Sequence, residues 1–124
     1  MKPNEEKIII GLMTGTSADS LDCAAVSFRG DEMKVIGLSN YALPKKIQNE
    51  IFALSNSNLI DESKLKAIDE KLGKFFLEKT RHFLKTQSIE PNEVYAIGSH
   101  GQTIKHEPNS SSPISIQIGD PQII

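Results

Sequence analysis

The stretch Ile8-Ile9-Ile10-Gly11-Leu12-Met13 decides the fold of this chain. It is rich in β-branched residues and apolar at consecutive positions, a pattern typical of a strand that is covered on both faces. It is also far shorter than the ~20 apolar residues that a helix needs to cross a bilayer. We therefore predict that residues 8–13 form the central strand of a sheet.

Two further strand-like runs follow this stretch. After the small polar segment Thr14–Ser20, apolar residues resume over Leu21–Phe28, and a third run extends from Met33 to about Leu43. The residues Arg29-Gly30-Asp31-Glu32 between the second and third runs have the composition of a turn. Because both connections are short, we predict a three-stranded antiparallel meander.

Helical periodicity dominates the middle of the chain. After Pro44, which suits the start of a helix, Ile47, Ile51 and Leu54 recur on one helix face. A second and longer helix is predicted from Asp61 to about Gln87, because a single apolar stripe runs along it. The stripe consists of Leu65, Ile68, Leu72, Phe75, Phe76 and Phe83.

The last third of the chain reads as two short strands around a polar loop. Val94–Ile97 is predicted as a buried strand, and Ile114–Ile118 alternates apolar and polar residues as a half-buried strand does. Between them we predict a long loop over Gly98–Pro113, a length that is uncommon unless the loop binds a ligand. The predicted order is β-β-β-α-α-β-β, an α/β fold.

Composition excludes several classes of protein. The 124 residues carry 14 Lys and Arg against 16 Asp and Glu, so there is no basic field to hold nucleic acid. The single cysteine, Cys23, has no intrachain partner and is predicted to be an inert buried side chain. No apolar run like that of a signal peptide follows Met1–Glu6. We expect a cytoplasmic protein without nucleic-acid or membrane partners.

The polar segment between the first two strands is a candidate anion site. Its small residues would let backbone amides approach a phosphate, its hydroxyls add donors, and Asp19 or Asp22 could hold Mg²⁺ directly or through water. It is not a Walker A loop, because no Gly-Lys-[Ser/Thr] follows, and its glycines do not match the Rossmann pattern. The alternative interpretation is a hairpin loop in which Asp stabilises its own turn.

The segment Gly98–Thr103 follows a predicted strand, where α/β proteins often place ligand contacts. It is not a nucleophile elbow, because Ile97 stands where a glycine is required. His100 and His106 with Glu107 lack a further persuasive metal ligand. The alternative role for His100 is to fix the loop by hydrogen bonding.

The end of the chain has the pattern of a helix start. Asp120 is placed to cap a helix and Pro121 to occupy its first position, after which few residues remain. Asp120 could instead accept a hydroxyl hydrogen bond from a polar substrate near His100. We expect the chain to be the front part of a longer protein.

Taken together, three blocks of this sequence resemble the anhydro-N-acetylmuramic acid kinase family. The blocks are Gly11–Asp22, Ile97–His106 and Ile116–Pro121, in the order that the family has them, and the likeness covers nearly the whole chain. The resemblance implies the sugar kinase, Hsp70 and actin superfamily, in which two RNase-H-like lobes close on ATP and Mg²⁺. Residues 1–124 would form an incomplete N-terminal lobe.

The resemblance also implies a reaction and a set of site residues. The family uses ATP and water to open the 1,6-anhydro bridge of anhydro-N-acetylmuramic acid and phosphorylates O6, giving N-acetylmuramic acid 6-phosphate in cell-wall recycling. The nucleotide phosphates would be held by Gly15, Thr16, Ser17, Ala18, Asp19, Ser20, Leu21 and Asp22. Mg²⁺ would be held by Asp19 and Asp22, and the sugar would lie near His100, Gln102 and Asp120.

Some consequences concern what the chain lacks or changes. The family's general base lies downstream, so we expect no catalytic residue within 1–124 and no activity of this chain alone. Ser20 stands where the family has Gly, and it would be strained if its φ were positive. We also expect apolar surface that causes self-association, for example as a homodimer. The competing classes are a non-catalytic nucleotide-binding module and a hydrolase using Asp19 and Asp22, whose spacing argues against cooperation.

Overall fold

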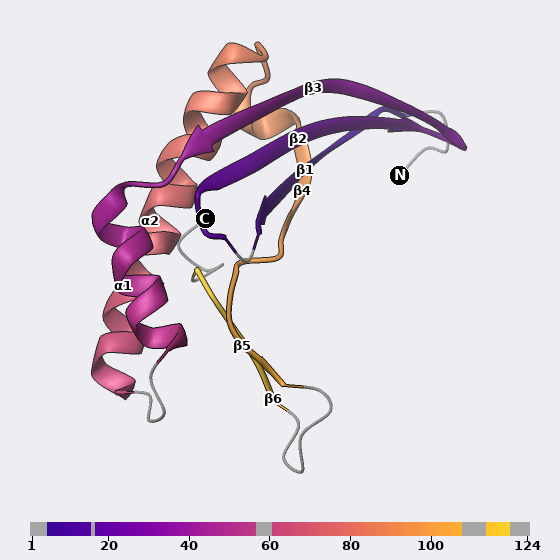
Figure 1. Ribbon diagram of the computed structural model, residues 1–124. Helices are drawn as coiled ribbons and strands as arrows, with labels where there is room; N and C mark the ends of the chain where they lie inside the picture. The colour runs from indigo at the N-terminus through magenta and orange to yellow at the C-terminus, as the bar shows by residue number, and fades with distance from the viewer. Residues whose placement is uncertain (1–4, 16, 57–60, 108–113, 120–124) are drawn as a thin grey trace.

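A computed structural model describes residues 5–15, 17–56, 61–107 and 114–119 (Figure 1). The predicted α/β class and the meander with two following helices are confirmed. The elements are β1 (Lys7–Thr14), β2 (Ser20–Arg29), β3 (Glu32–Ala42), α1 (Lys45–Ser55), α2 (Glu62–Thr86), a 3₁₀ turn (Pro91–Glu93), β4 (Val94–Ser99), β5 (Gln102–Glu107) and β6 (Ile114–Ile118).

The prediction of one long loop over 98–113 is wrong. Gln102–Glu107 forms β5, which pairs antiparallel with β6 in a separate two-stranded sheet. This segment carries Ile104 as its single apolar residue, so it has no alternating pattern that would have indicated a strand. Its backbone pairing with β6 forms the strand instead. The hairpin extends away from the main sheet beyond the end of β4 (Figure 1).

The main sheet has the strand order β3-β2-β1-β4, with β1 inside it as predicted. β1 pairs antiparallel with β2 and parallel with β4. The parallel pair is possible because the two helices carry the chain from β3 back to the same end of the sheet. The C-terminal ends of β1 and β4, where the polar segments follow, therefore lie next to each other at the same end of the sheet.

Both helices cover the same side of the sheet (Figure 1), and the hydrophobic core lies between the helices and the sheet. Each large apolar side chain buried there stabilises the fold by roughly 1.5–3 kcal/mol. The most deeply buried of these are Ile10, Leu21, Ile51, Ile68, Leu72, Phe76 and Phe83, which include much of the predicted stripe. Asp61 caps α2 by accepting from the amides of Ser63 and Lys64. Neither α1 nor α2, the α-helices of the described residues, is long and apolar enough to cross a membrane.

The opposite side of the sheet keeps apolar side chains exposed. Met13, Met33, Val35 and Leu38 are each more than half exposed. Parallel strands are usually covered on both faces, so this open face is unusual for a sheet that contains the β1/β4 pair. The predictions that β1 is covered on both faces and that Val94–Ile97 is buried are therefore wrong, since β1 buries only alternate residues and most of β4 is exposed. This exposed apolar face is a surface of the kind that we expected to cause self-association. The self-association itself stays a prediction.

Cys23 on β2 behaves as the sequence predicted. Its side chain is 1% exposed. Burial, with a smaller contribution from the charge of Asp22, raises the pKa of the Cys23 thiol to about 11. The thiol therefore stays protonated and inert at neutral pH.

Candidate functional site

The loop between β1 and β2 is held by its carbonyl groups. The Gly15 carbonyl accepts from the Gln102 side-chain amide at 3.0 Å, and the Ser17 carbonyl accepts from the Gln48 amide at 3.1 Å. The Asp19 carbonyl accepts from the Leu43 backbone N–H at 2.9 Å. Groups from β5, from α1 and from the segment before α1 thus fix one short loop.

The loop's amides are used more sparingly. The Ala18 N–H donates to the Gly15 carbonyl at 3.0 Å and closes a turn, so this amide does not point to a ligand as we had expected of the loop. Within the described residues, the amides of Gly15 and Ser17 make no such internal bond. The Asp19 amide likewise makes no such bond, so these three amides are the ones, among the described loop residues, that remain for an anion.

Backbone strain in the loop falls at Ala18 and not at Ser20. Among the described non-glycine residues, only Ala18, with φ of 51°, and Ser88 have positive φ. The Ala18 side chain is fully buried, which holds the residue in this unfavourable conformation. Ser20 begins β2 without a positive φ, so it carries no strain of the kind we considered.

Asp19 in the loop and Asp22 on β2 are both exposed, and among the described residues each carboxylate accepts a side-chain hydrogen bond. The Ser17 hydroxyl donates to Asp19 at 3.0 Å, as in the alternative interpretation of a self-stabilised turn. Asn40 on β3 donates from its side-chain amide to Asp22 at 2.6 Å and to the Ser20 hydroxyl at 2.9 Å. Our sequence analysis missed Asn40, although the meander register places it directly opposite Asp22.

The segment 100–102 lies along the end of β1. The His100 N–H donates to the Leu12 carbonyl at 3.1 Å, and the Thr14 hydroxyl donates to the Gly101 carbonyl at 3.0 Å. His100 Nδ1 lies 3.2 Å from the Gly101 carbonyl, which can only accept, so Nδ1 carries the proton in this contact. His100 therefore helps to fix this segment, the alternative role that we had kept open.

The predicted sugar-side residues differ in accessibility. His100 is exposed, whereas Gln102 is fully buried. Asp120 and Thr16 lie outside the described residues, as do the side chains of His106 and Glu107. In the ranges that the structure does describe, no group of three or more acidic, histidine or cysteine side chains is placed to hold a metal.

A hollow of about 740 Å³ lies on the open face of the sheet and is lined by residues of β1, β2, β3 and β4 and by His100. Asp22, Asn40 and His100 give it a polar end. Gly11 and Gly98, which pair across β1 and β4, form part of its floor. Apart from each glycine's chain neighbours, no atom of the described residues lies within 4 Å of the position that a Cβ would take. The hollow therefore has room above the backbone next to the polar groups.

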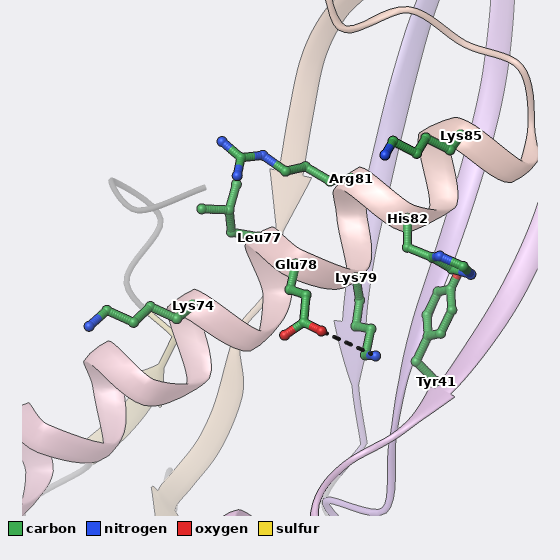
Figure 2. A pocket seen from close by; sticks show the side chains of 8 residues that line it. All are labelled: Tyr41, Lys74, Leu77, Glu78, Lys79, Arg81, His82 and Lys85. Atoms are coloured by element: carbon green, nitrogen blue, oxygen red, sulfur yellow. Dashed lines mark ion pairs between the residues drawn. The ribbon is translucent and has the colours of Figure 1, made fainter.

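A second hollow, of about 510 Å³, is basic and lies on α2 (Figure 2). It is lined by Tyr41, Lys74, Leu77, Glu78, Lys79, Arg81, His82 and Lys85. None of these residues belongs to the β1–β2 loop or to the segment 100–102. Figure 2 shows Lys74 and Arg81 pointing away from Tyr41 and His82, so the basic groups do not converge on one anion.

The strand order, the helical crossover and the loop at the end of β1 define a class of protein, an α/β lobe of the actin-like ATPase type. The particular family follows from comparison with known proteins. The family model described as anhydro-N-acetylmuramic acid kinase matches residues 7–124, and the chain belongs to this family. The resemblance seen in the sequence is thereby confirmed.

Individual relatives carry the same description. The chain is 31% identical over 119 residues to an anhydro-N-acetylmuramic acid kinase of Vibrio vulnificus, covering 96% of this chain and 32% of the relative. It is 38% identical over 115 residues to those of Shewanella pealeana and Coxiella burnetii, covering 93% of this chain and 31% and 30% of the relatives. The chain therefore spans about a third of the length of these relatives.

Proposed function

We propose that residues 1–124 act as the phosphate-binding N-terminal lobe of an ATP-dependent kinase. The reaction would open 1,6-anhydro-N-acetylmuramic acid with water and transfer phosphate to O6, giving N-acetylmuramic acid 6-phosphate. The observation that carries this proposal is the β1–β2 loop, in which three carbonyls accept hydrogen bonds from β5, from α1 and from the segment before α1. A kinase family model matches the chain from residue 7 onward.

The donor set of the loop fits a nucleotide phosphate. The amides of Gly15 and Ser17 are donors that suit phosphate oxygens. Because the carbonyls of Gly15, Ser17 and Asp19 are already paired, these three acceptor oxygens need not face a polyanion. Ser17 is also exposed, so it can be reached from solvent.

The carboxylates fit Mg²⁺ in the manner of a kinase. Asp19 and Asp22 are exposed and would hold the ion directly or through water. Mg²⁺ keeps several waters and commonly takes only one or two protein carboxylates beside the substrate phosphates, so a cluster of three acidic residues is not required. When bound, the ion would supply positive charge that neutralises the transferring phosphoryl group.

The roles of the remaining residues follow from their exposure. His100 is exposed beside the hollow and is available to contact the sugar, together with Asp120 in this proposal. Phosphoryl transfer depends chiefly on positioning and charge neutralisation. This lobe would thus contribute binding, and we expect the chain alone to bind Mg²⁺–ATP without phosphorylating the sugar.

Calorimetric titration with Mg²⁺–ATP tests the proposal. Ser17→Glu puts a negative charge at an exposed loop position and is expected to weaken binding at least ~10-fold through like-charge repulsion. Asn49→Glu puts the same charge on the exposed surface of α1 and serves as the matched control. Equal affinities of the two variants, or an absence of binding by the wild-type chain, would contradict the proposed function.

A further inference from the structure

Three consecutive residues, two before β5 and the first residue of β5, bind the end of β1 and the loop that follows it. The His100 N–H reaches the Leu12 carbonyl, the Gly101 carbonyl accepts from Thr14, and the Gln102 amide reaches Gly15. The first two contacts hold β1 itself. The third contact alone holds the β1–β2 loop.

The Gln102 side chain is oriented by its partners. Its Nε2 donates to the Gly15 carbonyl at 3.0 Å and to the Thr103 carbonyl at 3.3 Å. Both partners are carbonyl oxygens that can only accept, so the NH₂ group must face them and the amide cannot be flipped. The side chain is 0% exposed, which makes this orientation a fixed feature of the interior.

The other end of the same amide is unsatisfied. Gln102 Oε1 is buried and has no hydrogen-bond partner within the described part of the chain. A buried acceptor without a partner destabilises a fold, and an apolar side chain of similar length would avoid that cost. A glutamine at this position is therefore best explained by what its nitrogen does, which is to hold Gly15.

The contact joins two parts of the proposed kinase lobe. Gly15 opens the turn that Ala18 closes, so its carbonyl sets the course of the phosphate-binding loop. Gln102 pairs with Ile118 at the base of the β5–β6 hairpin. The same end of that hairpin is anchored to α2, where the Gly119 N–H donates to Asp69 at 2.7 Å.

We propose that Gln102 is a positioning residue that couples the β1–β2 loop to the β5–β6 hairpin, rather than a residue that contacts the sugar. A nucleoside triphosphate bound at the loop would restrict the hairpin through this amide, and the hairpin would in turn set the affinity of the loop. The choice of ligand rests on the proposed function. The coupling itself rests on the contacts of Gln102.

Hydrogen exchange of the ligand-free chain tests the positioning role. Gln102→Met keeps the length of the side chain and removes its amide. Thr14→Val removes the neighbouring buried hydrogen bond to the Gly101 carbonyl and leaves the bond between Gln102 and Gly15 in place. We expect exchange of the Ala18 amide to rise about 5-fold in Gln102→Met and to stay unchanged in Thr14→Val. If Gln102→Met does not fold, Gln102→Asn, whose amide is one methylene short, replaces it. Reduced thermal stability with unchanged Ala18 exchange would overturn the proposal, because it indicates a merely structural role.

Amide resonances followed during Mg²⁺–ATP titration test the coupling. In the wild-type chain we expect shifts at residues 15–19 and also along residues 102–107. In Gln102→Met the resonances of the loop should still shift but should need a several-fold higher nucleotide concentration to do so. The shifts of the hairpin resonances should disappear. Wild-type shifts confined to the loop would overturn the coupling. A wild-type loop that does not respond would contradict the proposed function, whereas the ligand-free exchange result stands independently of it.

Discussion

Strand β2 is entered and left by two connections that are built differently. The β2–β3 connection is a short turn in which Gly30, with φ of 61°, supplies the left-handed conformation without a side chain to strain it. The β1–β2 connection places a similar conformation at a buried alanine and is tied to β5, α1 and the segment before α1. The β2–β3 connection reverses the chain by its local geometry alone. The β1–β2 connection makes tertiary contacts in addition, although reversal of the chain does not require them.

The largest expected effect comes from breaking the second connection at Ala18. Ala18→Val adds a β-branched side chain at a fully buried residue with positive φ, and we expect a loss of about 3 kcal/mol in the free energy of unfolding. Gly30→Ala is the matched change in the β2–β3 turn and should cost only about 1 kcal/mol. Urea unfolding measures both. Equal losses would show that the two connections are held alike.

Ionisation of Cys23, which lies on the strand that both connections share, should lower the thermal stability of the whole fold. The pKa of Cys23 is raised to about 11 from an ordinary value of 9.0, so the unfolded chain loses this proton first as the pH rises. The contribution to stability is complete below pH 9 and is lost progressively between pH 9 and 11. We expect the thermal midpoint of the wild-type chain to fall by about 5 °C more than that of Cys23→Ala across this range. Parallel melting curves would contradict the assignment.

A smaller effect is expected at the exposed tie between α1 and the loop. Gln48→Met removes the donor to the Ser17 carbonyl while leaving the aliphatic part of the side chain. Stability should change by less than ~0.5 kcal/mol because the bond is exposed, whereas Mg²⁺–ATP affinity should fall about 3-fold as the loop loosens. Asn49→Ala, on the same helix, should change neither quantity. Unchanged affinity in Gln48→Met would mean that this tie does not shape the loop.

Much of the fold could be predicted because its strands and helices carry strong periodic patterns. The apolar run of β1, the turn residues before β3 and the stripe of α2 each indicated their element correctly. β5 could not be found, because a strand that is held by pairing with β6 and carries few apolar residues has no such pattern. Local sequence therefore predicted the sheet and helices but not the hairpin beside the site.

The candidate site was predictable only in its local part. The loop itself is contiguous in sequence and was identified from its small and polar residues. The groups that hold it are distant along the chain, since Gln48 is 31 residues from Ser17 and Gln102 is 87 residues from Gly15. The resemblance placed Gln102 near the sugar, and its burial could not be seen in the sequence. Such contacts depend on how the chain folds back, which no local pattern encodes.

The most direct test of the central claim replaces Mg²⁺ by paramagnetic Mn²⁺ in a titration of the isotope-labelled chain with Mn²⁺–ATP. If the β1–β2 loop is the phosphate site, the amide resonances of Gly15, Ser17, Asp19 and Asp22 should broaden first, while those of Gly30 and Asp31 stay sharp. Broadening centred on Lys74, Arg81 and Lys85 of the basic hollow would contradict the account.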